Sequence, residues 1–317
     1  MSGAGTSLEI NLTAAIVAME AGAPCVLVTE AAAPETDAGL PSGPFDPRQH
    51  RTFEMGLRSW VREQTALDVG YVEQLYTFGD RGRHMRAGDA GPHIVSVGYL
   101  ALTRRTDAAG TSAKAGFHPW YDHFPWEDWR DGPPALLDYL MPLLNTWSQE
   151  SGTSPTDRRA RFQLAFGRGG EWDEEKVLDR YELMYEAGLV EESRRDGRKA
   201  ALARHDVRHL GRSMRFDHRR ILATAMGRLR AKLKYRPVVF ELMPETFTLT
   251  ELQRTVEAIS GRHLHKQNFH RLVEAGELVE PTGASSTETG GRPAQLFRFR
   301  REVVAERPAG LRLGTRA

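Results

Sequence analysis

The sequence contains one cysteine, Cys25, among 317 residues. A single thiol cannot form a disulfide within the chain, and without a second cysteine there is no CxxC pair to ligate zinc. Long hydrophobic runs are also missing, since no stretch approaches the roughly 18 apolar residues that a membrane helix needs. The N-terminal segment lacks a basic region followed by an apolar one, so we expect no signal peptide. These absences favour a cytoplasmic protein with no membrane partner.

A strong net charge is absent too, but the formal value of +1 conceals an asymmetry. Residues 212–300 hold 16 Lys and Arg against 9 Asp and Glu, whereas the rest of the chain holds 27 against 33. Basic charge concentrated in one region is what contacts with nucleic-acid phosphates require. Because a modest basic excess is common, it supports a nucleic-acid partner only together with a motif.

Such a motif lies in residues 247–300. Apolar residues recur there at helical spacing, at Leu252, Val256 and Ile259. Either Thr248 or Thr250 can cap this helix, and Glu251 is placed as the capping-box partner of Thr248. Gly261 follows where a left-handed C-terminal cap is expected.

A second helix is predicted from about His265 to Ala275, closed by Gly276. Polar turn residues at 282–291 and an alternating segment at 295–300 then predict a two-stranded hairpin. Helix, turn, helix and hairpin is the order of a winged helix-turn-helix, whose second helix enters the major groove of DNA.

The outer face of the second helix consists of hydrogen-bond donors, and Asn, Gln and Arg can pair two-fold with base edges. Arg292, in the hairpin sequence GGRP, can approach a phosphate or a minor groove. The predicted DNA-contacting residues are Thr248, Thr250, Lys266, Gln267, Asn268, His270, Arg271 and Arg292. We therefore predict a double-stranded DNA operator as partner. The alternative is a winged helix that mediates protein contacts and has a merely solvated polar face.

The N-terminal region is expected to form a sheet. Residues 8–29 contain two strand-like runs joined by the turn AGA, and their mostly apolar side chains predict a sheet covered on both faces. Cys25 is expected to be a small buried residue there. Residues 71–78 and 93–103 are rich in β-branched and aromatic residues and predict further strands.

Residues 41–67 resemble a Nudix domain, whose signature is a Gly-rich loop leading into a helix with REUxEExGU, U being apolar. The signature positions fall on Ser59, Trp60, Val61, Glu63, Gln64, Ala66 and Leu67. In the family, three glutamates on one helical face hold Mg²⁺ and activate the water that cleaves a pyrophosphate. Here the three positions are Trp60, Glu63 and Gln64. One carboxylate cannot neutralise the divalent ion, so no catalytic residue, no metal and no other cofactor is predicted. Trp60 is expected either in the core or in the vacated metal pocket.

The Gly-rich segment 79–92 carries Arg81 and Arg83, which can be a phosphate clamp or part of a mobile surface loop. The segments QLYTFGDRGR, IVSVGYLALT, FDHRRILATAMGRLRAKLKYRPVVFELMPETFTLTELQ, NFHR and GRPAQLFRF together resemble the NrtR-like regulators of NAD metabolism. The resemblance covers about residues 8–105 and 212–300. It implies a non-hydrolytic Nudix domain that binds an ADP-ribose-type nucleotide, fused to a winged helix that represses NAD-biosynthesis genes as a dimer. The predicted nucleotide-binding residues are Arg58, Glu63, Arg81 and Arg83.

Residues 104–211 depart from this pattern. A linker is predicted at 104–116, an aromatic core or interface cluster at 117–131, and amphipathic helices at 134–147 and 174–197. We interpret this region as an inserted helical subdomain with an interface role.

A long helix at 212–236 should join the two recognised parts, with Asp217 and His218 as a helix-start pair. The predicted fold class is α+β, a Nudix-like α/β/α sandwich with a mixed sheet, a helical insertion and a C-terminal winged helix-turn-helix. The predicted domains are 7–130, 131–211 and 212–302. Two other functions stay open: an active Nudix hydrolase of ADP-ribose or a related dinucleotide, and an adaptor for protein contacts.

Overall fold

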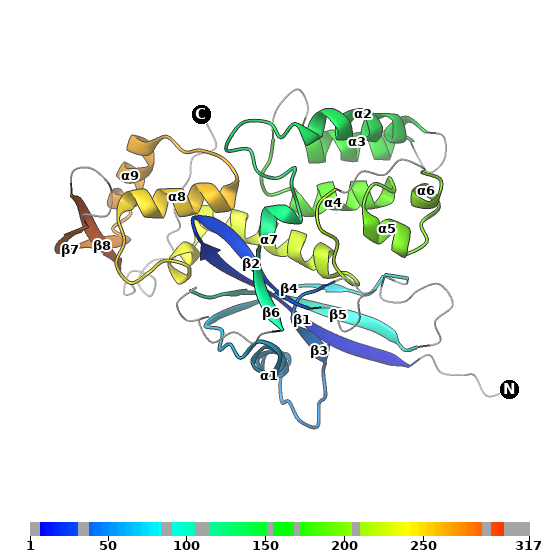
Figure 1. Cartoon of the computed structure of the whole chain (residues 1–317), viewed down its shortest axis with the longest axis horizontal. Coiled ribbons are helices and arrows are strands. Elements are labelled where there is room, and N and C mark those ends of the chain that lie inside the picture. The colour runs from blue at the N-terminus through cyan, green and yellow to red at the C-terminus, as the bar shows by residue number, and fades with distance from the viewer. Residues whose placement is uncertain are drawn as a thin grey trace.

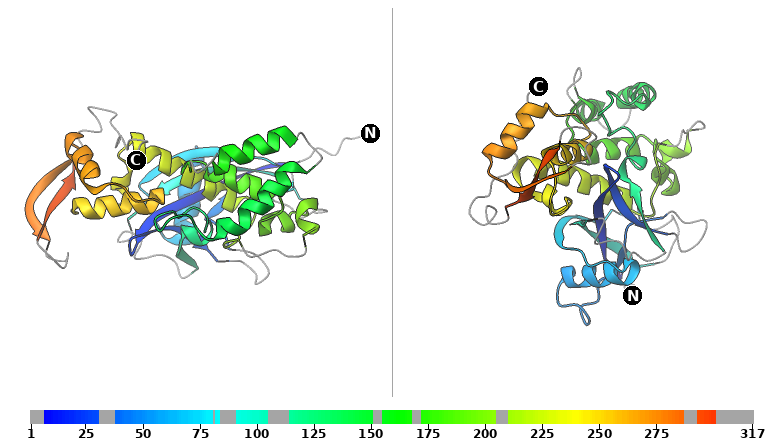
Figure 2. Two further views of the ribbon diagram at one scale, coloured as in Figure 1. Left: turned by 90° about the horizontal axis from the view of Figure 1, so that it is seen from above. Right: turned by 60° about the vertical axis from the view of Figure 1, so that its left-hand side comes forward.

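The computed structural model consists of a layered α/β body and a winged helix at one end of it (Figure 1). The structure describes residues 7–30, 38–80, 82–83, 91–104, 114–150, 155–167, 172–204, 210–286 and 293–300. Within these ranges, no helix is both long and apolar enough to span a bilayer. Two further views show the winged helix projecting beyond the edge of the helical layer (Figure 2).

A mixed sheet forms the centre of the α/β body, as predicted. Its strands are β1 (Leu8–Glu20), β2 (Ala23–Thr29), β3 (Ser42–Pro44), β4 (Tyr71–Phe78), β5 (His93–Leu102) and β6 (Ala115–Pro119). The order is β4-β5-β1-β2-β6, with β3 also paired to β1. Strands β1 and β5 are parallel and the other pairs are antiparallel. Strand β6 corrects the end of the predicted linker at 104–116, because Ala115 and Gly116 pair with β2, whereas residues 105–113 lie outside the described residues.

Strand β1 is buried on both faces, as its apolar sequence predicts. Leu12 and Ile16 pack with helix α1 (Phe53–Thr65) in one apolar cluster, whereas Ala15 and Val17 lie in a second, larger cluster that contains α7 (His218–Tyr235). Alternate residues of a strand point to opposite faces, so the sheet lies between the two helices. Figure 1 shows this sandwich, with α1 below the sheet and α7 above it.

Helix α7 begins six residues later than the sequence predicts. The backbone N–H groups of Arg212 and Arg215 donate to the carbonyls of Asp122 and Ala38, so this stretch bonds to other segments instead of forming a helical turn. Asp217 is the N-cap residue, and the buried His218 accepts a hydrogen bond from the Leu40 N–H at Nδ1 (2.9 Å). The predicted helix-start pair therefore also fixes the chain before β3.

Helix α4 (Val177–Glu186) packs on α7. Beyond it lie α2 (Leu136–Gln149), α3 (Pro155–Phe166), α5 (Glu191–Arg195) and α6 (Lys199–Leu202), with α3 packed on α4 and α2 on α3. Trp120, Phe124 and Trp126 are fully buried, which confirms the aromatic segment as core. The sequence did not predict α3.

The C-terminal region has the predicted order α8 (Leu249–Ser260), α9 (Lys266–Ala275), β7 (Val279–Ser286) and β8 (Ala294–Phe299). Thr248 and Glu251 form the capping box, and Gly261 ends α8 with a φ of 74°. Strand β7 continues to Ser286, into the segment predicted as a turn, because Ser285 and Ser286 pair with β8 after a register shift.

Candidate nucleic-acid interface and nucleotide pockets

Helix α9 presents a polar face to solvent. Lys266, Gln267, Asn268 and Arg271 are exposed, whereas the opposite face buries Phe269 against the core. The helix therefore exposes four of the predicted DNA-contacting side chains, and Gln267, Asn268 and Arg271 share the face that is free to enter a groove. The Arg271 Nη2 donates to Asn268 Oδ1 (2.9 Å), so these two groups are already oriented together.

The remaining predicted DNA-contacting residues lie in different environments. His270 is half-buried, and burial together with the nearby Lys266 lowers its pKa, which favours the neutral ring. The Thr248 hydroxyl is buried and accepts the Glu251 N–H in the capping box, while Thr250 is half-exposed in the first turn of α8. Arg292 lies outside the described residues. For all four, contact with DNA stays a prediction.

The basic excess of residues 212–300 is not all available to phosphates. Arg219 and Arg230 are each 1% exposed, and their guanidinium groups pair with Glu192 and Glu127 inside the protein. Lys234 likewise pairs with Glu174 and Glu175. Part of the charge asymmetry therefore comes from cations that neutralise acidic residues of the preceding region, which corrects its use as a measure of phosphate contacts.

Two of the three positions that hold metal in the Nudix signature, Trp60 and Gln64, make structural contacts here. The Trp60 indole donates from Nε1 to the Pro44 carbonyl (2.8 Å), and its ring lies where a side chain on Gly43 would be. Gln64 makes two hydrogen bonds to the backbone of Ser42, at 3.1 and 2.6 Å. Both side chains hold α1 against β3, and Glu63 is exposed.

This donor set does not fit Mg²⁺. A hard divalent cation requires several carboxylate or carbonyl oxygens around one point, and α1 offers one carboxylate here. Among the described residues, no group of three or more His, Cys, Asp and Glu could hold a metal ion.

The signature glycine is replaced by Ala66, which keeps the conformation that a glycine would adopt. Ala66 is the C-cap of α1 with a φ of 59°, in the left-handed region. Its N–H donates to the Arg62 carbonyl at 2.9 Å, so the turn closes as a helix end. The turn geometry that the signature glycine provides is thus present here, although the signature's metal positions hold Trp60 and Gln64.

The predicted nucleotide-binding residues do not form one site. Arg58 and Glu63 lie on α1, and Arg58 donates to the carbonyls of Val69 and Gly70 at the end of that helix. Arg83 lies on the opposite side of the sheet, where it pairs with Glu182 of α4. Arg81 lies outside the described residues. The structure therefore separates the phosphate-clamp prediction from the Nudix helix.

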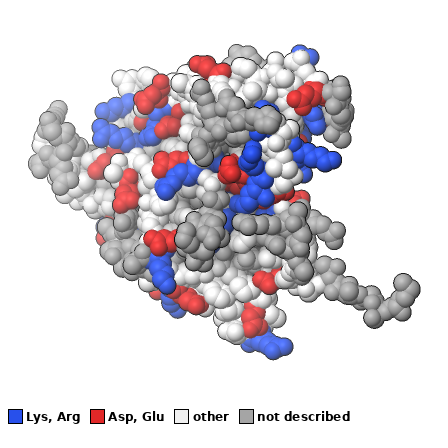
Figure 3. All heavy atoms as spheres, turned by 45° about the vertical axis from the view of Figure 1, so that its right-hand side comes forward, with Lys and Arg blue, Asp and Glu red and all other residues white. Residues whose placement is uncertain are grey.

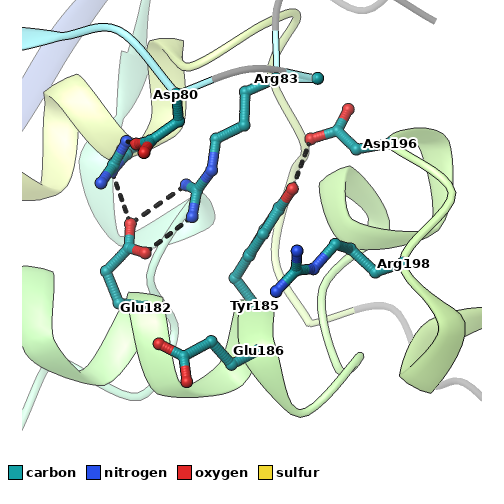
Figure 4. Close-up of a pocket in the computed structure, with 9 residues that line it drawn as sticks. Asp80, Arg83, Glu182, Tyr185, Glu186, Asp196 and Arg198 are labelled. Carbon is teal, nitrogen blue, oxygen red and sulfur yellow. Dashed lines mark hydrogen bonds and ion pairs between the residues drawn. The ribbon is translucent and has the colours of Figure 1, made fainter. Parts of the chain in front are cut away.

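Arg83 lines a cavity of about 380 Å³ between the end of β4, helix α4, the α5–α6 turn and the start of α7 (Figure 4). Its guanidinium donates to both oxygens of Glu182, at 3.1 and 2.8 Å, and lies 3.8 Å from the centroid of the Tyr185 ring. Arg220 also pairs with Glu182, with 2.6 Å between its Nε and Glu182 Oε1. Behind them, burial raises the pKa of Asp217 to about 6, against the opposing effect of Arg83 and Arg220.

The other cavity residues were not predicted from the sequence. Glu182 and Tyr185 lie on α4, Arg198 lies between α5 and α6, and Arg220 lies on α7, so no local spacing links all of them. On this side of the molecule, basic and acidic side chains lie next to one another (Figure 3). The cavity therefore forms only when α4, α7, the α5–α6 turn and the segment after β4 come together in the fold.

Comparison with known proteins identifies the region that carries α9. Residues 239–299 match the family described as the NrtR DNA-binding winged helix domain. The C-terminal domain is therefore similar to the NrtR winged helix domain. A curated relative, the ADPR responsive transcriptional repressor NtrR of Acinetobacter baylyi, is 47% identical over 85 residues. This alignment covers 26% of the chain and only a third (33%) of that repressor.

The fold as a whole is also that of known structures. Shewanella oneidensis NrtR in complex with a 27mer DNA matches with a TM-score of 0.57 and 21% identity, over 93% of this chain and 95% of that one. A MutT/nudix family protein from Enterococcus faecalis matches with a TM-score of 0.52 and 14% identity, over 93% and 87%. The predicted combination of a Nudix-like sandwich with a winged helix is thus confirmed at the level of the fold.

The winged helix is hydrogen-bonded directly to the α/β body. Arg230 of α7 donates from Nε to the Ile259 carbonyl (2.9 Å), and the Tyr121 hydroxyl donates to the Ala258 carbonyl (2.7 Å), both at the end of α8. The Trp129 N–H donates to the Gly261 carbonyl (2.7 Å) in the turn that leads toward α9. A displacement of α7 would therefore reach the predicted recognition helix.

Proposed function

We propose that this protein is a DNA-binding transcriptional repressor of NAD-biosynthesis genes. The observation that carries the proposal is the exposure of Lys266, Gln267, Asn268 and Arg271 on α9, within the region that matches the NrtR winged helix domain. Amide and guanidinium groups on one helix face can make paired hydrogen bonds with base edges, and Lys266 can contact a phosphate. The relative from Acinetobacter baylyi is named a repressor, which supports this function.

In the same proposal, an ADP-ribose-type nucleotide bound by the degenerate Nudix-like domain controls the affinity for the operator. The relative's name as ADPR responsive supports this choice of effector. The nucleotide must bind the two conformations with different affinities, and a coupling of about 1–3 kcal/mol would change operator affinity roughly 5- to 150-fold. The contacts of α7 with both the sheet and α8 provide a rigid connection. We further propose a homodimer, which suits an operator with two half-sites.

The test is a binding titration of the full-length protein with labelled DNA from the region upstream of its own gene. We expect selective binding that weakens steeply with salt and weakens further when ADP-ribose is added. Binding that is equal for unrelated DNA would end the repressor proposal. Selective binding that ADP-ribose leaves unchanged would reject only the proposed effector. Light scattering on the free protein gives its molar mass and so tests whether it is a dimer.

Hydrolysis of ADP-ribose is the competing function, because the fold is Nudix-like and Glu63 is retained and exposed on α1. The contacts of Trp60 and Gln64 with β3 favour a structural use of this helix. Incubation with Mg²⁺ and ADP-ribose, followed by detection of AMP, separates the two. Turnover that is lost in Glu63→Gln would establish the enzyme.

A further inference from the structure

The carboxylates that line the cavity beside Arg83 all have partners, whereas one of its arginines has no carboxylate partner among the described residues. Each of its carboxylates already has a cationic or hydroxyl partner. Glu182 pairs with Arg83 and Arg220, Asp80 with Arg220, Glu186 with Arg161, and Asp196 with Arg195 and the Tyr185 hydroxyl. Arg198 differs, since no described carboxylate lies within ion-pairing distance of its exposed guanidinium. Among the described charged groups that line the cavity, the Arg198 guanidinium therefore has no carboxylate partner.

Arg198 is placed close to the other arginines of the cavity. Its guanidinium lies 5.5 Å from the centroid of the Tyr185 ring, and that of Arg83 lies 3.8 Å from the same centroid. Figure 4 shows the two guanidinium groups flanking the ring. Tyr185 is itself held by the hydrogen bond from its hydroxyl to Asp196 (2.9 Å). A rigid ring thus separates two cationic positions, one exposed and one mostly buried.

We propose that this cavity binds a diphosphate-bearing small molecule, with Arg198 contacting one phosphate and Arg83 the other after Glu182 is displaced. Arginine forks match phosphate oxygens in pairs, and a diphosphate carries two anionic groups that suit the two positions. Glu182 holds both Arg83 and Arg220, so a phosphate that replaces it meets two guanidinium groups at once. The cavity volume of about 380 Å³ is in the range of small-molecule sites.

The site is distinct from the Nudix helix, which lies on the other face of the sheet. It is lined mainly by residues of the helical insertion and of the segment after β4, together with Arg220 of α7. The proposal therefore does not require a nucleotide at α1, nor binding to DNA.

Isothermal titration of the full-length protein with inorganic pyrophosphate, and separately with ADP-ribose, tests the site. Arg198→Ala should weaken pyrophosphate binding at least about tenfold, because a charge-assisted hydrogen bond is lost. Glu182→Gln should strengthen it, because the competing carboxylate charge is removed. Arg159→Ala, which removes an exposed arginine of α3 outside the cavity, should change nothing. Thermal melts check that each variant is folded, and Arg198 is exposed enough for its replacement to be tolerated.

The opposite effects of the two variants are specific to the proposal. Absence of pyrophosphate binding, or equal affinity in the wild-type protein and Arg198→Ala, would overturn it. Weaker binding in a folded Glu182→Gln variant would also overturn it, since displacement predicts the reverse. An Arg198-dependent affinity for ADP-ribose would assign the site to nucleotides, and dependence for pyrophosphate alone would assign it to free diphosphate. These titrations contain no DNA, so failure of the repressor proposal would leave their outcome unaffected.

Discussion

Arg230 and Glu127 form an ion pair that is fully buried, with 2.7 Å between Nη1 and Oε2. Glu127 also receives two hydrogen bonds from Arg180 of α4, at 2.6 and 2.8 Å. Burial opposes ionisation of Glu127, but the two arginines outweigh it and keep the pKa of its carboxyl below the ordinary value. One carboxylate thus joins α4 and α7 at the place where Arg230 also holds the end of α8.

Removing this charge should be costly. Glu127→Gln preserves the size of the side chain but leaves two buried guanidinium groups without a counter-ion. We expect the free energy of unfolding to fall by about 3–5 kcal/mol. Urea denaturation measures it. The neighbouring change Asp128→Asn is the control, because the Asp128–Arg130 pair is partly exposed and should contribute at most about 1 kcal/mol. Equal losses in the two variants would contradict a structural role for the buried cluster.

The sequence predicted those features that depend on local periodicity and capping. The capping box at Thr248, the helix end at Gly261 and the outward face of α9 are set by residues within a few positions of each other. The two-sided burial of β1 follows similarly from its nearly continuous apolar sequence.

Features that depend on distant contacts were not predictable from the sequence. The Glu127 cluster joins residues separated by 53 and 103 positions, and the Arg83 cavity joins residues separated by 99 positions. The same reason explains why the basic excess of residues 212–300 overstates the charge available to phosphates. A sequence count does not distinguish the buried Arg230 from the exposed Arg271. Arg58 and Arg83 were both predicted to bind the nucleotide, but they lie on opposite faces of the sheet.

Arg271→Ala should weaken operator binding. The side chain is exposed on α9 and orients Asn268, so its removal loses one contact and disturbs a second. If Arg271 contacts a base, the loss should be about 1–3 kcal/mol and should relax selectivity at that base pair. Fluorescence anisotropy with labelled operator measures the affinity. The control is Arg62→Ala, an exposed arginine on α1 that pairs with Asp68. An unchanged affinity in Arg271→Ala would place the base-reading surface elsewhere.

Ala66→Gly should stabilise the protein, although glycine usually destabilises helices. Ala66 has a φ of 59°, where a Cβ atom costs about 1 kcal/mol or more. Glycine removes this strain but adds freedom to the unfolded chain, so we expect a net gain of up to about 1 kcal/mol. The matched control is Ala203→Gly, at the C-cap of α6 with an ordinary φ of −76°, which should lose stability. Chemical denaturation that shows a loss for both variants would mean that the strain at Ala66 is negligible.

His123→Asn should reduce the sensitivity of the fold to mild acid. Burial, together with the nearby Arg219, lowers the pKa of His123 to about 4, although its Nδ1 lies 2.9 Å from the Arg212 carbonyl. The unfolded chain takes up this proton near pH 6.5, so the free energy of unfolding should fall by about 3 kcal/mol as the pH drops from about 6.5 to about 4.

Asn at this position can keep the hydrogen bond to Arg212 but does not titrate, so the slope due to His123 should disappear. Asp217 has the opposite effect, because its raised pKa of about 6 makes stability fall as the pH rises from about 4 to about 6. Subtracting the curve of His123→Asn from that of the wild-type protein cancels the contribution of Asp217. Urea denaturation from pH 4.0 to about 7.5 gives both curves, and parallel curves would show that His123 is not the residue that resists protonation.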